Sequence, residues 1–289
     1  YGDHRDLHLS IRRQRQMCIR DRDPSDVDYS KYGIKDALLI DNTGIVSDEE
    51  GLSAHLKNKE IKKVLLTAPV KSGLKNIVYG VNHDDIKDTD KIIGAASCTT
   101  NAIVPVLSAI DNEFKIDNGH VETVHAYTND QNLIDNYHSK NRRGRAAALN
   151  MVLTETGAAS AVSQVLPNLE GKISANAIRV PTPNVSLAIL KLYLEKPSEL
   201  EKFNEFLKQT AFHSLLKDQI DFSISTENVS SDFVGSKYAA VIDGQSTIIK
   251  DRNAVVYVWY DNEFGYCAQL LKVIKKMSGI QYRKLPNFL

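Results

Sequence analysis

The part of the chain with the clearest chemical potential is the sequence SCTTN at 97–101, in which a cysteine is surrounded by hydroxyl groups and an amide. An apolar run at 91–96 precedes it, and apolar residues at near-helical spacing follow from Asn101 to Phe114. This pattern predicts that Cys98 lies between a strand and the N-terminus of a helix. Free backbone N–H groups and the helix dipole favour the thiolate there, and the thiolate is the nucleophilic form. The sequence therefore predicts covalent chemistry at Cys98.

The other two cysteines fit a structural role better. An isolated cysteine usually behaves as a small buried apolar residue, and Cys267 lies in an apolar helical run. Cys18 lies in a segment that we expect not to belong to the fold. The three cysteines have no regular spacing, so the sequence indicates neither disulfides nor a metal site.

A histidine and a cluster of arginines add to this chemistry. His125 ends the predicted strand 120–124, and an imidazole near a cysteine can stabilise the thiolate and relay protons. Taken alone, such a histidine is more often structural. The arginines of RRGR at 142–145 are followed by Thr156 and Gly157 at a predicted helix N-terminus. Guanidinium groups, a hydroxyl and free N–H groups together favour an anion site, and a solvated loop is the alternative.

Arg179 is a charged residue in apolar surroundings, within AIRVPTPNVS at 177–186. Its planar guanidinium either pairs inside the protein or holds an anion. We therefore count Arg179 among the candidates for an anion site.

The elements that position these residues alternate between strand and helix from residue 23 onward. Apolar strands are predicted at 37–41, 63–69 and 76–81, and a helix is predicted at 48–59. Strands that are apolar throughout and joined by a helix indicate a parallel sheet covered on both faces, which is half of a doubly wound nucleotide-binding domain. Ligands of such sheets bind beyond the carboxyl ends of the strands. The crevice expected there is lined by Thr43, Gly44, Thr67 and Cys98.

The remainder of the chain has a different pattern. Segments 121–128, 185–195 and 254–260 alternate or are apolar and β-branched, which predicts a mixed or antiparallel sheet. Helices are expected after Pro197 and over 262–277. The predicted fold class is α/β, with a partial doubly wound (Rossmann-type) domain joined to an α+β catalytic domain. The expected units are 23–97 for the second half of the dinucleotide-binding domain, 98–261 for the catalytic domain and 262–289 for a helix that returns to the first domain.

Composition restricts the classes of function. The chain has 289 residues with 36 basic and 36 acidic side chains, and zero net charge argues against nucleic acid as a main partner. No apolar run reaches the roughly 18 residues that a membrane span needs. Residues 1–22 hold six arginines and no lysine, whereas the rest holds six arginines and 24 lysines, and part of 1–22 resembles translated sequencing-adapter sequence. We expect 1–22 to be a non-native tail, with a genuine basic arm as the alternative.

Five blocks together resemble the glyceraldehyde-3-phosphate dehydrogenase family. In chain order they are SCTTN at 97–101, VHAYTND at 124–130, TGAA at 156–159, RVPTPNVS at 179–186 and WYDNEFGY at 259–266. Each block is weak alone, but the combination is specific, and the resemblance covers residues 24 to 287. It implies a phosphorylating aldehyde dehydrogenase of glycolysis, which oxidises D-glyceraldehyde 3-phosphate with NAD and inorganic phosphate to 1,3-bisphosphoglycerate.

The resemblance also implies roles for individual residues. Cys98 would attack the aldehyde, and His125 would keep the sulfur nucleophilic and act as acid and base. The substrate phosphate would be bound by Thr128, Asp130 and Arg179. The inorganic phosphate would be bound by Ser97, Thr156, Gly157 and an arginine of the triplet, for which we favour Arg142 over Arg143, with Thr99 nearby. The cofactor would be bound by Thr43, Gly44, Thr67, Asn262 and Tyr266.

Two departures from the family pattern concern the cofactor. No two glycines in the chain have the spacing Gly-x-Gly, so we expect that the first half of the cofactor domain is missing. We expect this truncated chain to bind NAD weakly or not at all, and therefore to be inactive or nearly so. In addition, Asn136-Tyr137 stands where NAD-specific relatives often carry Leu-Pro, which leaves both NAD and NADP open.

Other classes of function remain as alternatives. One is a related dehydrogenase acting on erythrose 4-phosphate, and another is a non-catalytic fragment that keeps the catalytic domain and its subunit contacts. A cysteine hydrolase would explain Cys98 and His125 but neither anion site. The family is typically a cytoplasmic homotetramer, and the loop 129–150 resembles the segment that packs beside a neighbour's cofactor site. We expect the same location and assembly for the intact protein.

Overall fold

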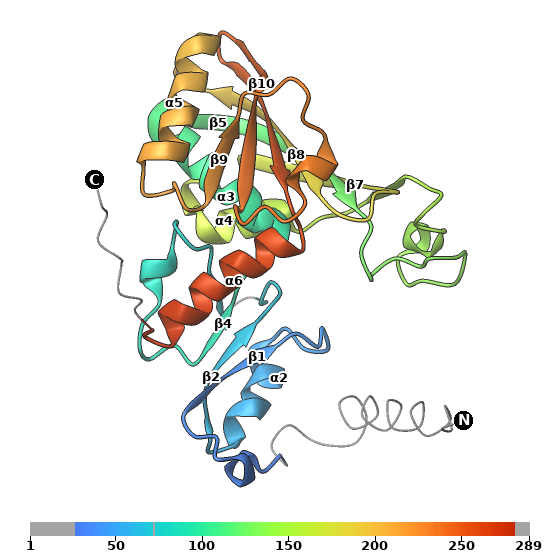
Figure 1. Cartoon of the computed structure of the whole chain (residues 1–289), viewed down its shortest axis with the longest axis vertical. Helices are drawn as coiled ribbons and strands as arrows, with labels where there is room; N and C mark the ends of the chain where they lie inside the picture. The colour runs from blue at the N-terminus through green and yellow to red at the C-terminus, as the bar shows by residue number, and fades with distance from the viewer. Residues whose placement is uncertain (1–26, 72, 281–289) are drawn as a thin grey trace, which may run out of the picture.

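The computed structural model describes residues 27–71 and 73–280 and shows two lobes, each built on its own sheet (Figure 1). The predicted tail at 1–22 lies outside the described residues. The smaller lobe has a four-stranded sheet and the larger lobe has a seven-stranded sheet. Helix α6 (Phe264–Met277) extends from the larger lobe onto the smaller one (Figure 1). The predicted α/β class, with a parallel sheet and a mixed sheet, is confirmed.

The smaller sheet is parallel throughout, as predicted. Its strands, in the order β1-β2-β4-β3, are β1 (Ala37–Asp41), β2 (Ile61–Leu66), β3 (Lys75–Asn76) and β4 (Ile92–Gly94). The register pairs Asp41 with Leu66 and Leu66 with Gly94. The carboxyl ends of three strands therefore share one edge, and the loops that carry the candidate crevice residues start there.

The strand predicted over 76–81 is shorter than expected. It ends at Asn76, because the side chain of Asn82 bonds to the backbone on both sides: it accepts from the N–H of Val78 at 2.8 Å and donates to the carbonyl of Asn76 at 2.9 Å. Gly80, with φ +92°, then completes a turn.

The larger sheet is mixed, as predicted, with the strand order β6-β7-β5-β8-β11-β10-β9. Its strands are β5 (Ile116–Ala126), β6 (Val152–Thr154), β7 (Ile173–Val180), β8 (Ser186–Leu194), β9 (Ile220–Ser223), β10 (Ala240–Lys250) and β11 (Asn253–Tyr260). The pairs β5–β7 and β9–β10 are parallel, and the other neighbours are antiparallel. The sequence indicated β5, β8 and β11 but not the other four.

Helix α3 (Cys98–Phe114) lies inside the larger lobe, and 13 of its 17 residues are buried. Helices α4 (Ala158–Val165) and α5 (Leu200–His213) contribute to the same apolar core. The helix predicted over 48–59 is instead a short α2 (Glu49–Ser53) followed by a 3-10 turn. The 3-10 turns of the described chain are Tyr29–Tyr32, Ala54–Lys57, His83–Asp85, Asn141–Gly144, Pro167–Leu169 and Ser230–Phe233.

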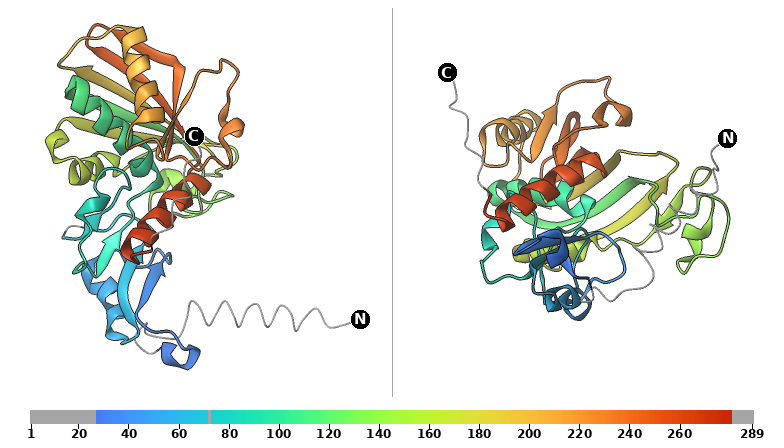
Figure 2. Two further views of the ribbon diagram at one scale, coloured as in Figure 1. Left: turned by 60° about the vertical axis from the view of Figure 1, so that its left-hand side comes forward. Right: turned by 60° about the horizontal axis from the view of Figure 1, so that its bottom comes forward.

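Helix α6 joins the two lobes (Figure 2). Its residues Val273 and Met277 pack with Leu65 and Ile93 of the smaller sheet. Cys267 of this helix is exposed, so the expectation that it is a buried apolar residue is wrong. None of the helices within 27–280 is long and apolar enough to cross a membrane.

Candidate active site

Cys98 is the first residue of α3 and follows a tight turn that its neighbours hold in place. Ser97 caps the helix, and its Oγ accepts a hydrogen bond from the N–H of Thr100 at 3.1 Å. The amide of Asn101 donates to two carbonyls of the turn at 2.9 and 3.0 Å. Ala96 has φ +56°, which is unfavourable for a residue with a Cβ. The hydroxyls and the amide of this stretch thus build the turn that places the sulfur at the helix N-terminus.

His125, near the end of β5, brings an imidazole to the sulfur. Its Nε2 lies 3.5 Å from the Sγ of Cys98, and the residue is 5% exposed. Its ring meets the ring of Tyr260 edge to face, with 5.9 Å between the centroids. The Tyr260 hydroxyl in turn lies 3.0 Å from Oγ1 of Thr99. The proximity of cysteine and histidine that the sequence predicted is therefore present.

Burial opposes the ionisation of both groups. It raises the pKa of the Cys98 thiol, although bonds to Thr99 and the charge of Arg179 act in the opposite direction. Burial, followed by the charge of Arg179, lowers the pKa of His125 to about 4. The two groups are therefore a neutral pair near pH 7, which differs from the thiolate that the helix dipole alone favours.

Arg179 lies on β7 directly opposite His125 in the parallel register with β5. Its Nη1 lies 2.5 Å from Nδ1 of His125 and 3.1 Å from the carbonyl oxygen of Ala126. Its Nε is buried and has no hydrogen-bond partner among the described residues. A half-buried guanidinium with an unused donor next to the sulfur fits an anion site.

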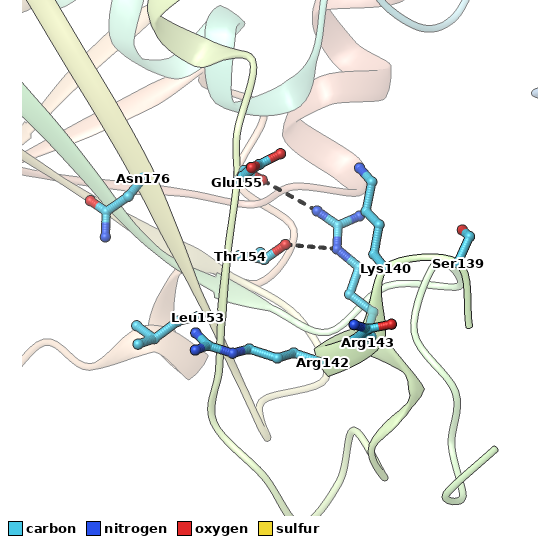
Figure 3. A pocket seen from close by; sticks show the side chains of 9 residues that line it. Ser139, Lys140, Arg142, Arg143, Leu153, Thr154, Glu155 and Asn176 are labelled. Carbon is cyan, nitrogen blue, oxygen red and sulfur yellow. Dashed lines mark hydrogen bonds between the residues drawn. The ribbon is translucent and has the colours of Figure 1, made fainter. Parts of the chain in front are cut away.

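Of the arginine triplet, the structure places Arg143 in the site and leaves Arg142 outside it, contrary to the choice made from the sequence. The 3-10 turn Asn141–Gly144 directs Arg143 inward, while Arg142 is exposed and lines a neighbouring cavity of about 560 Å³ (Figure 3). Gly144 permits this turn, because a Cβ there would lie 2.4 Å from the carbonyl oxygen of Asn136.

Each nitrogen of the buried Arg143 guanidinium is engaged, and Figure 3 shows the bonds to Thr154 and Glu155. Its Nε donates to Oγ1 of Thr154 at 2.9 Å, its Nη2 donates to the carbonyl of Glu155 at 3.3 Å, and its Nη1 pairs with the carboxylate of Asp130. Burial and the nearby charge of Arg179 lower the pKa of Arg143. Two guanidinium groups therefore act on the same space, where an anion is favoured.

A cavity of about 570 Å³ connects these groups. The predicted site residues that line it are Ser97, Cys98, Thr99, His125, Thr156, Gly157 and Arg179. Thr128 and Asp130 do not line it, and Asp130 reaches it only through Arg143. Sequence reasoning missed Lys140, which lines the cavity. The signal that could have identified it is that Lys140 extends the basic run of the triplet by two positions.

The residues expected at the outer part of a dinucleotide lie at the carboxyl edge of the smaller sheet. The Oδ1 of Asp41, at the end of β1, accepts from the N–H and the hydroxyl of Thr43 at 2.8 and 2.7 Å. Gly44 follows with φ +71°. The N–H of Thr67 donates to the carbonyl of Asp41 at 2.9 Å. Thr43, Gly44 and Thr67 are thus gathered at one edge, although none of them lines the cavity around Cys98.

Asn262 and Tyr266, expected at the inner part of the dinucleotide, lie close to the Cys98 turn. The hydroxyl of Tyr266 donates to the carbonyl of Ala96 at 3.1 Å. Asn262 is buried, its Oδ1 accepts from Ser186 at 2.9 Å, and its Nδ2 donates to Oε1 of Glu263 at 3.3 Å. An amide and a phenol are the kinds of group that fit the carboxamide and ring of a nicotinamide, although neither residue lines the cavity around Cys98. No group of three or more potential metal ligands occurs in the part of the chain that the structure describes.

Comparison with known proteins agrees with this geometry. Residues 97–262 match the family model described as glyceraldehyde 3-phosphate dehydrogenase, C-terminal domain. The chain is 60% identical to a glyceraldehyde-3-phosphate dehydrogenase-like protein of Pseudomonas aeruginosa, over 94% of this chain and 59% of that protein. It is 40% identical to glyceraldehyde-3-phosphate dehydrogenase 2 of Trichormus variabilis, over 94% of this chain and 80% of that protein. The chain thus spans less than two thirds of the Pseudomonas relative.

Proposed function

Because the chain belongs to the glyceraldehyde-3-phosphate dehydrogenase family, we propose that the cavity around Cys98 oxidises D-glyceraldehyde 3-phosphate to an acyl phosphate. The observation that carries this proposal is the 3.5 Å contact between the sulfur and Nε2 of His125, in a cavity that Arg143 and Arg179 also line. A nucleophile, a proton-transfer group and two anion-binding groups are the set that this oxidation needs.

Cys98 and His125 perform the covalent steps. The Cys98 sulfur adds to the aldehyde carbon, and its proton passes through Nε2 of His125 to the carbonyl oxygen, which gives a hemithioacetal. A nicotinamide dinucleotide, when bound, supplies the hydride acceptor. His125 takes the hydroxyl proton as the hydride leaves, and a thioester remains. An oxygen of inorganic phosphate then attacks the thioester carbon, the C–S bond breaks, and the acyl phosphate departs.

The two anions occupy different parts of the cavity in this proposal. The free Nε of Arg179 supports binding of the substrate phosphate there, with Thr128 near the end of β5. Inorganic phosphate binds at the N-terminus of α4, where Thr156 and Gly157 present donors, close to Ser97 and Arg143. Asp130 orients Arg143 rather than contacting phosphate itself.

The cofactor in this proposal is NAD or NADP. Asn262 and Tyr266 would hold its nicotinamide end, and Thr43, Gly44 and Thr67 would border the dinucleotide along the sheet edge. We further propose that the protein is a cytoplasmic homotetramer. Large apolar side chains exposed in the loop 129–150 support contact with another subunit; they are Leu133 (68% exposed), Ile134 (75%), Tyr137 (89%) and Leu149 (82%).

The test is reduction of NAD and of NADP with D-glyceraldehyde 3-phosphate and phosphate, by this chain and by the same chain extended with the upstream sequence of its gene. Phosphate-dependent activity that is lost in Cys98→Ser supports the proposal. If the chain turns over erythrose 4-phosphate faster than D-glyceraldehyde 3-phosphate, then erythrose 4-phosphate is the better assignment of the substrate. Folded protein without activity on either aldehyde, in both chains, would overturn the enzymatic assignment in favour of a non-catalytic role.

A further inference from the structure

Three polar atoms at the end of β5 have hydrogen-bonding requirements that cannot all be met. Nδ1 of His125 lies 2.7 Å from the carbonyl oxygen of Ala126 and 2.5 Å from Nη1 of Arg179, and that Nη1 lies 3.1 Å from the same carbonyl. A guanidinium only donates and a carbonyl only accepts, whereas Nδ1 of a neutral imidazole does one or the other according to its tautomer.

Each tautomer leaves one unfavourable contact. With a proton on Nδ1, His125 donates to Ala126 but faces an N–H of Arg179 at 2.5 Å. Without that proton, Nδ1 accepts from Arg179 but faces the carbonyl of Ala126 at 2.7 Å. The contact with the cationic donor is the shorter one, and charge-assisted hydrogen bonds are the stronger kind. Arg179 therefore favours the tautomer with the proton on Nε2.

The position of that proton decides what His125 can do to the substrate. Nε2 is the nitrogen that faces the sulfur, at 3.5 Å from Sγ of Cys98. With a proton on Nε2 the imidazole can donate to the sulfur or to an oxygen bound beside it, but it cannot take the hydroxyl proton of a hemithioacetal. Oxidation needs the other tautomer, in which Nε2 has a free electron pair.

Arg179 has an unused donor through which its position can be changed. Its Nε is buried without a partner, and its only hydrogen bonds within the described ranges go to His125 and Ala126. The charged and titratable groups around His125 are Cys98 from α3, Arg143 from the 3-10 turn, Tyr260 from β11 and Arg179 itself. None of them carries a negative charge at neutral pH, because burial raises the pKa of both Cys98 and Tyr260, so an entering anion meets no charged competitor for the guanidinium.

We propose that Arg179 is a positioning residue for His125: it holds Nδ1 as an acceptor until an anion binds the guanidinium, and Nδ1 then donates to the carbonyl of Ala126. This inference rests on the proposed function and deepens it. The phosphate group of the substrate activates the base that oxidises its own aldehyde group. Aldehydes that carry a phosphate are thereby favoured in two ways: they bind more tightly, and their oxidation step is faster.

The first test measures the tautomer directly and needs no activity. Long-range ¹H–¹⁵N spectra of the histidine-labelled chain at pH 7.5 distinguish a protonated Nδ1 from a protonated Nε2, and His125→Asn identifies the signal. We expect a protonated Nε2 without anion and a protonated Nδ1 in saturating phosphite. Arg179→Gln should show the protonated Nδ1 without anion, and Arg179→Lys should behave as wild type. Arg142→Gln, whose exposed side chain lies outside this cavity, is the control and should respond to phosphite as wild type does. A protonated Nδ1 already present in the anion-free wild type would overturn the proposal.

The second test uses turnover of unphosphorylated D-glyceraldehyde with and without phosphite. Phosphite should raise kcat by at least about 100-fold, the lower end of the 10²- to 10⁴-fold range of general base catalysis, and should do so without lowering KM in proportion. The proposal is contradicted if phosphite lowers only the KM for D-glyceraldehyde. It is also contradicted if phosphite has no effect although the enzyme is active with D-glyceraldehyde 3-phosphate. Absence of activity with the phosphorylated aldehyde contradicts the proposed function instead, and the spectra still decide the role of Arg179.

Discussion

The sulfur of Cys98 lies 3.5 Å from Nε2 of His125, although 27 positions separate the two residues in the chain. Helix α3 carries the chain away from the sulfur over 17 residues, which is about 26 Å. Strand β5 begins at Ile116, two positions after α3 ends, and returns to His125 over nearly the same length, about 30 Å. The matched lengths of one helix and one strand therefore create the pair.

Stability should depend on pH through His125. Its pKa is lowered from 6.5 to about 4 in the folded protein, so the unfolded chain takes up this proton first as the pH falls. The stabilising effect is complete above pH 6.5 and is lost between pH 6.5 and 4, with an upper limit of about 3 kcal/mol. Urea unfolding of wild type and His125→Asn from pH 4.5 to 8 measures it. Curves that stay parallel through this window would refute the assignment to His125.

The sequence predicted this pair but not the third group next to it. The cysteine and the histidine belong to recognisable blocks, and the apolar strand and helix around Cys98 follow from periodicity. The position of Arg179 opposite His125 depends on the parallel register of β5 and β7. Strand β7 was not predicted, because its sequence ISANAIRV interrupts the apolar alternation with small and polar residues.

The sequence also could not decide which arginine of the triplet binds an anion. Arg142 and Arg143 are adjacent and chemically identical, and the sequence resemblance favoured Arg142. Only the 3-10 turn Asn141–Gly144 decides which guanidinium is buried. The parallel sheet of the smaller lobe, in contrast, was predictable because strands buried on both faces are apolar throughout.

Replacing Arg143 should affect phosphate use much more than replacing Arg142. Arg143 lines the cavity and is buried, whereas Arg142 is exposed and lines only the neighbouring cavity. Loss of a charge-assisted bond of about 1.5–3 kcal/mol corresponds to roughly a 10- to 100-fold higher KM for phosphate in Arg143→Gln. Arg142→Gln is the matched control and should stay within about twofold of wild type. Equal KM values for phosphate in the two variants would contradict the assignment of Arg143, rather than Arg142, to the phosphate site.

The hydroxyl of Tyr260 should stabilise the fold beneath the site. It lies 3.0 Å from Oγ1 of Thr99, and both residues are buried. Tyr260→Phe leaves the Thr99 hydroxyl without this partner, which should lower the free energy of unfolding by about 1–2 kcal/mol. Tyr257→Phe on the same strand is the control, because the Tyr257 hydroxyl forms no hydrogen bond within the described part of the chain. Urea unfolding of both variants measures the difference, and equal values would exclude this contribution.

Lys140 should supply positive charge that the phosphate site can use without disturbing the fold. Every nitrogen of the neighbouring Arg143 guanidinium already has a partner, whereas the exposed amine of Lys140 lines the same cavity and forms no ion pair with any residue the structure describes. An entering phosphate therefore gains the full attraction of Lys140 and has to compete with Asp130 for Arg143.

Lys140→Gln should raise the KM for phosphate by about three- to tenfold, weaken its dependence on salt, and change the free energy of unfolding by less than about 0.5 kcal/mol. Lys140→Arg should restore the KM, and Lys217→Gln, an exposed lysine outside the cavity, should leave it unchanged. If Lys140→Gln and Lys217→Gln have the same KM for phosphate, then Lys140 plays no part in binding and the α4 N-terminus with Arg143 is the complete site.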